Sequence, residues 1–212
     1  MELLQKLTLY DLFGYTLPGV LAVWLYLYGG DMARMDEFSV GSLCMLVILG
    51  YVAGALITEI AERLEWAIEK IINKKAKWKN YTHEKFWCGI CENYKVSKDM
   101  VTHALEQAKV TDYDQSFPVD ALVKDYATYM YSEIQASPEY DRLDTYASAE
   151  LLYKNMFLVS LFAIGLGICR QQYVQIVIGV LGAVFFAIRR VRFAERSRGY
   201  AISWFIQKYG RE

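Results

Sequence analysis

The sequence predicts an all-α membrane protein, with four transmembrane helices and a cytoplasmic helical domain inserted between the second and the third. Of its 212 residues, 55% are hydrophobic, and the mean hydropathy is +0.14. The apolar residues gather in four blocks without Asp, Glu, Lys or Arg, at residues 12–30, 38–58, 155–169 and 171–188. Nowhere does an apolar residue alternate with a polar one over a length that would indicate a strand.

The length of each block decides whether it can cross a bilayer. A helix rises about 1.5 Å per residue and the hydrocarbon core is about 30 Å thick, so the first two blocks are long enough by themselves. The last two need their flanks, where Leu151 and Leu152 precede the third block and Lys154 can extend to the interface. This composition argues against a secreted disulfide scaffold, a basic nucleic-acid-binding domain and an ordinary soluble enzyme.

The distribution of basic residues predicts the topology. The first block is not a removable signal peptide, because only Lys6 precedes it as a cation and no A-x-A cleavage pattern follows. The fourth block is followed by Arg189, Arg190, Arg192, Arg196 and Arg198. Basic flanks stay on the cytoplasmic side. We therefore expect a multi-pass protein of the bacterial inner membrane, with both termini and residues 59–150 in the cytoplasm.

The first two spans form an N-terminal hairpin, residues 1–58. Thr8 and Asp11 have the spacing of a capping box at the start of the first helix, and Pro18 predicts a kink in it. The second span carries Gly50, Gly54 and Thr58 at a spacing of four, a small-residue stripe that lets another helix approach closely. The stripe serves either packing within the chain or an oligomer interface.

Start signals divide the cytoplasmic domain, residues 59–150, into helices. The second helix continues about 20 residues past Thr58, because no Pro or Gly stops it. Further helices are expected at 83–93, at 98–109 after Ser97, and at 118–135 after Pro118. The segment Ser137-Pro138-Glu139 opens a long helix that becomes the third span.

A C-terminal hairpin, residues 151–188, and a basic amphipathic tail, residues 189–212, complete the chain. The tail places Trp204, Phe205 and Ile206 behind the arginine cluster. That composition predicts a helix lying in the inner-leaflet interface. The alternative is a tail folded back onto the cytoplasmic domain.

One constellation resembles a metal site: His83, Cys88, Cys91 and His103, spaced H-x4-C-x2-C-x11-H. Cysteine and histidine are the ligands of tetrahedral zinc, although the order is not that of a common zinc finger. Structural zinc is one interpretation, and two small buried cysteines in a helical core are the other. No other cofactor is indicated.

Known catalytic motifs are absent from the sequence. It contains no G-x-S-x-G, P-loop, H-E-x-x-H or G-x-G-x-x-G pattern, so we do not expect an enzyme. The spans also lack the ionisable residues with which ion-coupled transporters bind their substrates. A pore would need several copies of the chain.

A basic cluster follows the second span: Lys74, Lys75, Lys77 and Lys79, with Trp78. It lies too far from the membrane for headgroup attraction along a straight helix, so an anionic cytoplasmic ligand or a partner is one interpretation. A solvated helix face is the other. Because residues 59–150 hold 12 basic and 17 acidic residues, no direct binding of nucleic acid is expected.

The segment DLFGYTLPGVLAVW, residues 11–24, together with the two-span, helical-insert, two-span plan, resembles small membrane proteins of bacterial antiviral defence loci. These include membrane effectors of nucleotide-signalling systems and accessory membrane proteins of CRISPR loci. The resemblance implies a homo-oligomeric effector that permeabilises the inner membrane when its cytoplasmic domain receives a signal, such as a nucleotide or a soluble protein. The alternative is a non-catalytic membrane scaffold that recruits a soluble partner through residues 59–150.

Overall fold

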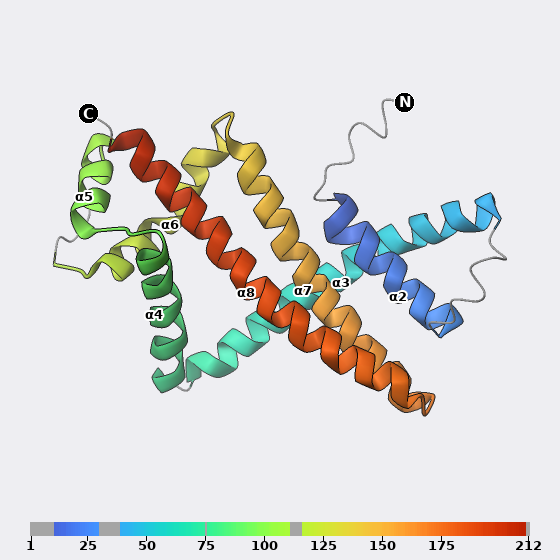
Figure 1. Cartoon of the computed structure of the whole chain (residues 1–212). Coiled ribbons are helices and arrows are strands. Elements are labelled where there is room, and N and C mark those ends of the chain that lie inside the picture. Colours follow the sequence, from blue (N-terminus) through green and yellow to red (C-terminus); the bar gives the residue numbers. More distant parts are fainter. Residues whose placement is uncertain (1–10, 30–38, 75, 111–115, 211–212) are drawn as a thin grey trace. The chain divides into compact units, whose positions relative to one another are not determined.

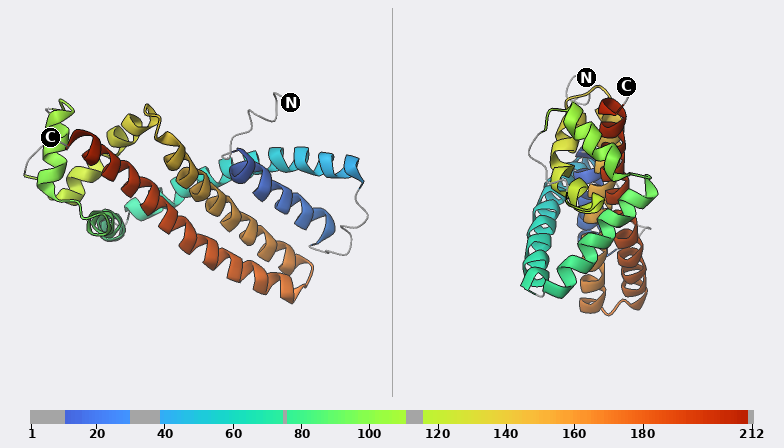
Figure 2. Two further views of the ribbon diagram at one scale, coloured as in Figure 1. Left: turned by 45° about the horizontal axis from the view of Figure 1, so that its top comes forward. Right: turned by 90° about the vertical axis from the view of Figure 1, so that its left-hand side faces the viewer.

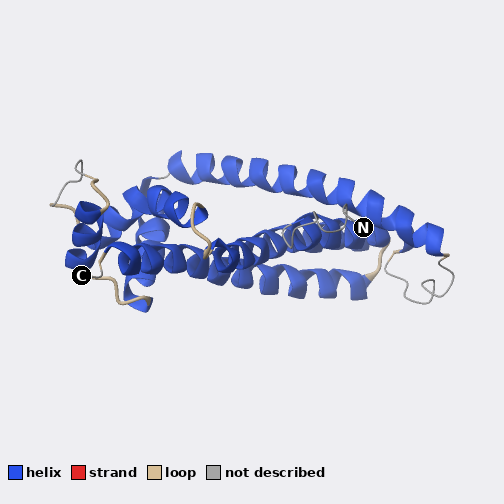
Figure 3. Cartoon of the chain, turned by 90° about the horizontal axis from the view of Figure 1, so that it is seen from above, coloured by secondary structure: helices blue, strands red, loops and turns tan. Residues whose placement is uncertain are grey.

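The structure is a computed structural model that describes residues 11–29, 39–74, 76–110 and 116–210, without the side chains of residues 65–84. Its elements in chain order are η1 (Asp11–Thr16), α2 (Leu17–Tyr28), α3 (Val40–Lys74), α4 (Ala76–Asn93), α5 (Lys98–Gln107), α6 (Val119–Gln135), α7 (Tyr140–Cys169) and α8 (Tyr173–Tyr209) (Figure 1). Within these ranges there is no strand (Figure 3). The all-α prediction is confirmed.

Among the described residues, three helices are long and apolar enough to cross a membrane: α3 over Val40–Leu64, α7 and α8. Only 11% of the most apolar stretch of α3 and of α8 is buried within the chain, against 33% for α7. Soluble proteins rarely expose apolar surface on this scale. The prediction of a membrane protein is therefore supported.

The first predicted span, at residues 12–30, is divided. Its first part is the π-helix η1, and α2 has 12 residues, which is about 18 Å of helix and shorter than the hydrocarbon core. The four-span arrangement is not confirmed and stays a prediction.

The chain forms two compact units. The membrane unit comprises residues 1–67 and 147–193, and the helical unit comprises residues 68–146 and 194–212. The divisions fall within α3, α7 and α8, so each of these helices contributes residues to both units.

In the membrane unit, α7 and the first half of α8 lie side by side as a hairpin (Figure 2). Glycines allow the close approach. A Cβ on Gly179 would lie 2.7 Å from the Ile164 side chain, and one on Gly167 would lie 2.8 Å from the Ile176 side chain. The two helices are joined by a tight turn in which Gln171 has a φ of 56°.

In the helical unit, α4, α5, α6 and the end of α8 surround one apolar core. Its largest fully buried side chains include Ile90, Leu105, Leu122, Met130 and Phe205. The helices predicted at 98–109 and 118–135 are confirmed as α5 and α6, whereas α4 begins at Ala76 rather than at residue 83. The predicted cap of α5 is also confirmed, because the Ser97 side chain accepts a hydrogen bond from the Met100 N–H at 3.3 Å.

The C-terminal segment corrects an expectation. Ile202, Phe205 and Ile206 lie in the core of the helical unit, with Phe205 0% exposed. The expectation of a tail lying in the membrane interface is wrong for these residues, and the alternative of a tail packed on the helical domain is what the structure has. An amphipathic helix offers its apolar face equally to a bilayer or to a protein core, and the pattern alone does not distinguish them.

The long helices follow their sequence signals closely. α3 ends at Lys74, 16 residues past Thr58, where about 20 were expected. α7 begins at Tyr140, two residues after Pro138, and runs without a break to Cys169, as predicted. At its start, the Ser137 hydroxyl accepts a hydrogen bond from the Glu139 N–H at 3.3 Å.

Candidate functional site

The most specific arrangement of polar groups in the membrane unit is centred on Asn155 of α7, which is 0% exposed. Its side-chain Nδ2 donates to the Gly14 carbonyl of η1 and to the Thr58 hydroxyl of α3, each at 2.7 Å. The Thr58 hydroxyl in turn donates to the Gly54 carbonyl at 3.0 Å. One amide group therefore joins three helices in an apolar environment, where unpaired polar groups are costly.

The sequence of the first helix explains why Gly14 needs this partner. Pro18 has no N–H, so the Gly14 carbonyl four residues earlier lacks its α-helical donor. The helix is a π-helix over Asp11–Thr16, where the Thr16 hydroxyl donates to the Asp11 carbonyl at 3.1 Å. Asn155 supplies the donor that the proline removes. The helix changes from π to α at Leu17, directly before Pro18, and the kink expected there stays a prediction.

The small-residue stripe packs against the first helix of the same chain. A Cβ on Gly54 would collide with the Tyr15 carbonyl, and a Cβ on Gly19 would collide with the Gly50 carbonyl. Thr58, the third member, is held by Asn155. The structure therefore places Gly50, Gly54 and Thr58 in contacts within the membrane unit.

Arg170, in the turn after α7, binds the carboxyl end of α2. Its guanidinium donates to the Tyr26 carbonyl at 2.7 Å and to the Leu25 carbonyl at 3.3 Å. The last carbonyls of a helix have no intrahelical donor, and a cation there also interacts favourably with the helix dipole. Arg170 thus joins the C-terminal hairpin to α2.

An apolar groove of about 580 Å³ lies between α2, α3 and α7. Apart from the phenol of Tyr26, hydrocarbon side chains form its walls. The lining residues are Ala22, Val23, Tyr26, Leu27, Leu49, Val52, Ala53, Leu56, Ile57, Ile60, Leu158, Val159 and Phe162.

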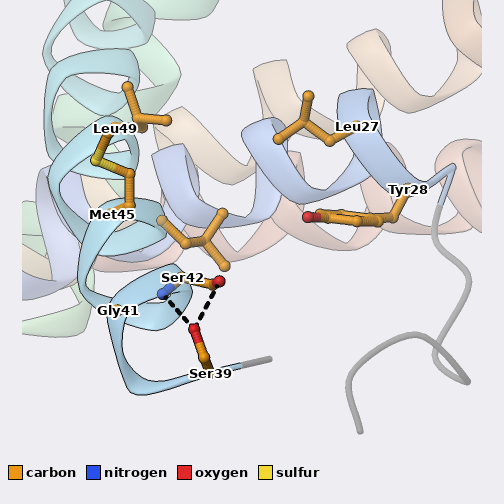
Figure 4. Close-up of a pocket in the computed structure, with 8 residues that line it drawn as sticks. Leu27, Tyr28, Ser39, Gly41, Ser42, Met45 and Leu49 are labelled. Atoms are coloured by element: carbon orange, nitrogen blue, oxygen red, sulfur yellow. Dashed lines mark hydrogen bonds between the residues drawn. The ribbon is translucent and has the colours of Figure 1, made fainter. Parts of the chain in front are cut away.

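A second hollow, of about 510 Å³, lies between the end of α2 and the start of α3. Figure 4 shows Leu27 and Tyr28 on one side and Met45 and Leu49 on the other. Its polar members already pair with each other, because the Ser39 hydroxyl accepts from the Ser42 N–H at 3.2 Å and lies 3.0 Å from the Ser42 hydroxyl. The hollow adjoins residues 30–38, which lie outside the described part of the chain.

The predicted metal ligands are not brought together where the structure describes them. Cys88 is exposed and its thiol donates to the Glu92 carboxylate at 3.6 Å, whereas Cys91 is buried in the core. Burial first, and then the nearby Asp120 carboxylate, raise the pKa of Cys91 to about 11.

His103 is half-buried on α5, and the side chain of His83 lies outside the described residues. In the part of the chain that the structure describes, no three His, Cys, Asp or Glu side chains form a group that could hold a metal ion. The zinc hypothesis therefore stays a prediction that depends on His83.

The basic cluster cannot be placed in the same way. The side chains of Lys74, Lys75, Lys77, Trp78 and Lys79 all lie outside the described residues. Its interpretation as a contact for an anionic ligand or a partner stays a prediction.

The helical unit carries one polar cluster that sequence reasoning missed. Glu133 of α6 accepts from the Tyr209 hydroxyl at 2.6 Å and from Lys208 Nζ at 3.0 Å. The hydrogen bonds from Tyr209 and from Lys208 lower the pKa of Glu133. The hydrogen bond with Tyr209 raises the pKa of Lys208. The cluster fixes the end of α8 to α6, and because its donors and acceptor satisfy one another, we assign it a structural role.

Three tyrosines of α6 pack on the core of the helical unit. Tyr126 and Tyr129 are partly buried against the larger core cluster, and Tyr131 against the smaller one. The Tyr129 ring lies 5.8 Å from that of Phe205, in an edge-to-face arrangement. An exposed apolar patch is therefore not found at these residues.

Comparisons with known proteins add no assignment: no family model, no curated protein and no solved structure matches this chain.

Asn155 is the residue joining three helices that sequence analysis overlooked, although it opens the third apolar block. The chemistry of two residue types could have predicted this hydrogen bond between helices. An amide at the edge of an uncharged span needs a partner, and a proline in another span leaves a carbonyl without one.

Proposed function

We propose that this chain is a non-catalytic effector of the bacterial inner membrane, acting in antiviral defence, whose copies assemble and permeabilise the bilayer when the helical domain receives a cytoplasmic signal. The resemblance of residues 11–24 and of the overall plan to membrane proteins of defence loci suggests the biological setting. The structure supports the physical part of the proposal through the packing of its helices.

In the described part of the membrane unit, the helices meet closely at glycines where an added Cβ would collide with the neighbouring backbone, as at Gly19 and Gly54. The four apolar blocks contain no Asp, Glu, Lys, Arg or His. A change in permeability therefore requires surfaces between several copies, which is why the proposal includes assembly.

The observation that carries the proposal is a regular apolar stripe on the outward face of α8. Its residues recur at intervals of three and four, and their side chains are 48% to 74% exposed. The members are Val174 (74%), Val177 (58%), Ile178 (64%), Leu181 (65%), Val184 (57%), Phe185 (48%) and Ile188 (52%). Because lipid is as apolar as protein, an apolar face gains nothing from leaving the lipid as such. Helices with such a stripe pack side by side provided that the shapes of their side chains interlock.

Membrane potential in bacteria tests the proposal. The full chain is expressed alone and with its genomic neighbours, beside a Leu181→Trp variant and a matched Ile48→Trp variant. Ile48 is 61% exposed on α3 and lies away from the stripe. We expect depolarisation with the wild-type chain and with Ile48→Trp, and a loss of depolarisation with Leu181→Trp.

Gly50→Leu and Gly54→Leu are unsuitable for this purpose, because both glycines contact the first helix of the same chain. A variant that fails to fold would be confused with one that fails to assemble. An unchanged potential under every condition would contradict the effector proposal and favour the recruiting scaffold.

A further inference from the structure

The structure assigns a second property to the membrane unit, which does not rest on the proposed function: we propose that the apolar groove between α2, α3 and α7 binds one acyl chain of a phospholipid whose headgroup is zwitterionic and carries a primary ammonium.

The walls of the groove select a hydrocarbon ligand. On α3 the lining positions Leu49, Val52, Ala53, Leu56, Ile57 and Ile60 recur at intervals of three and four along one face of the helix. This face extends over the 12 residues from Leu49 to Ile60, or about 16 Å, which is about half of the hydrocarbon core. A charged or polar ligand would lose its hydration there without finding partners.

The groove suits a single hydrocarbon chain. Its volume of about 580 Å³ lies in the ordinary range of ligand pockets. An extended acyl chain is thin enough to lie along this face of α3, over the small side chains of Ala22 and Ala53. A helix from a second copy is the alternative occupant, and cross-linking through Val52→Cys distinguishes the two.

The ends of the walls supply charges of both signs for the headgroup. One helical turn beyond Ile60, Arg63 pairs with Glu59 at 2.9 Å. One turn before Leu158 on α7, Lys154 lies 3.8 Å from Glu62. The two carboxylates and the Arg63 guanidinium are more than half exposed, whereas the Lys154 side chain is 13% exposed.

This balance of charge decides the headgroup class. A phosphate can accept from Arg63, and an adjacent primary ammonium can donate to Glu59 or Glu62. An anionic headgroup without an ammonium would pair with the two cations, but it would also be repelled by the Glu59 and Glu62 carboxylates. A quaternary ammonium would have no N–H to donate. A phospholipid of the ethanolamine class therefore fits better than a glycerol or choline phospholipid.

Native mass spectrometry of the full chain, purified from bacterial membranes in mild detergent, tests the inference. Leu56→Trp fills the groove from a position that is 61% exposed, and Ile48→Trp is the matched control, also 61% exposed on α3 but outside the groove. We expect one ethanolamine phospholipid per wild-type or Ile48→Trp chain. Occupancy in Leu56→Trp should fall about tenfold or more, because the lipid loses several buried CH₂ contacts.

Headgroup selectivity is measured by adding back ethanolamine, glycerol or choline phospholipids to the delipidated chain. We expect ethanolamine phospholipid to bind best, and the double substitution Glu59→Gln, Glu62→Gln to remove this preference while a lipid is still retained. Melting temperatures in detergent verify that each variant is folded.

Three results would overturn the inference. The first is a folded wild-type chain that retains no phospholipid. The second is equal occupancy in wild type and Leu56→Trp. The third is efficient disulfide cross-linking between two copies through Val52→Cys in native membranes, above the level of the wild-type cysteines, which would show that a second copy covers the groove. None of them bears on membrane potential, so failure here is separable from failure of the proposed function.

Discussion

The side-chain amide of Asn155 and the hydroxyl of Thr58 form a 2.7 Å hydrogen bond between α7 and α3, across 97 positions of the sequence. The same amide nitrogen donates to the Gly14 carbonyl. The arrangement therefore joins the N-terminal hairpin to the C-terminal hairpin at a fully buried point. One N–H of the amide donates to the Gly14 carbonyl, which has no α-helical donor because Pro18 lacks an N–H. The other N–H donates to the Thr58 hydroxyl on the small-residue stripe.

Removing the Asn155 amide should destabilise the membrane unit. Asn155→Leu keeps a similar volume but leaves the Gly14 carbonyl without this donor, and we expect a loss of about 1–3 kcal/mol in the free energy of unfolding. Thermal unfolding of the full chain in detergent measures it.

A double-mutant cycle with Thr58→Val isolates the hydrogen bond between the two side chains. Such bonds within membranes contribute about 0.6 kcal/mol on average, and about 1.7 kcal/mol at most. Strict additivity of the two single substitutions would contradict a direct interaction between Asn155 and Thr58.

Adding a methyl group at Gly54 should separate α3 from the first helix. In Gly54→Ala the new Cβ meets the Tyr15 carbonyl, which is backbone and cannot move aside as a side chain can. We expect a loss of about 1–3 kcal/mol, as for overpacking elsewhere.

Gly165→Ala in α7 is the matched control. A Cβ there has no neighbour within 4 Å, so the helix should gain a few tenths to about 1 kcal/mol in stability from the reduced backbone freedom. Thermal unfolding in detergent should rank Gly165→Ala above wild type and Gly54→Ala below it. Equal melting temperatures for the two alanine variants would show that η1 does not pack on Gly54.

Phe205→Ala should unfold much of the helical unit. The ring is 0% exposed within the core, and its edge meets the rings of Tyr129 and Tyr209. Truncating a buried phenylalanine costs about 3–5 kcal/mol.

Hydrogen exchange of the full chain localises this effect. Loss of protection is expected in α5 and α6 with Phe205→Ala, and none with Gln207→Ala at an exposed position of the same helix. Unchanged protection of α5 and α6 in Phe205→Ala would support a tail bound to the membrane instead.

The contact between α6 and the end of α8 should weaken in acid. The pKa of Glu133 is lowered in the folded chain, chiefly by the hydrogen bond from Tyr209 and then by that from Lys208. A group with a lowered pKa stabilises the fold above its unfolded pKa and loses this contribution as pH falls through the folded value. The loss therefore occurs below about pH 4.5, the ordinary value of the carboxyl.

The contribution of Lys208 to stability depends on pH in the opposite direction. Its pKa is raised from 10.5 in the folded chain, so its contribution is complete below that pH and is lost only in more alkaline solution. Between these limits, Glu133→Gln should cost about 1 kcal/mol, a value reduced by the partial exposure of both side chains. Hydrogen exchange of residues 200–209 against pH measures the effect, and the acid-dependent step should be absent from Glu133→Gln. The same step in both chains would assign it to another carboxyl.

Local signals determined most of the secondary structure. Ser97 and Pro118 begin α5 and α6 as the sequence predicts, and the absence of Pro and Gly between Tyr140 and Phe162 keeps α7 unbroken. These signals act within one or two helical turns, where neighbouring residues alone decide the backbone conformation. The uncharged blocks likewise mark the apolar helices through composition, without reference to their neighbours.

The tertiary structure decided which surfaces meet. Gly50 and Gly54 can serve a neighbour in the same chain or in another, and only the position of Tyr15 and Gly19 against them settles the contact that is observed. The apolar face of residues 202–206 fits a bilayer as well as a protein core, and it is buried in the helical unit because α4, α5 and α6 leave an apolar surface to be covered. Asn155 looks like one polar residue at the edge of an apolar block until the fold brings Gly14 and Thr58 beside it. Apolar packing and hydrogen bonds between distant residues depend on three-dimensional proximity, which periodicity and composition along the chain do not contain.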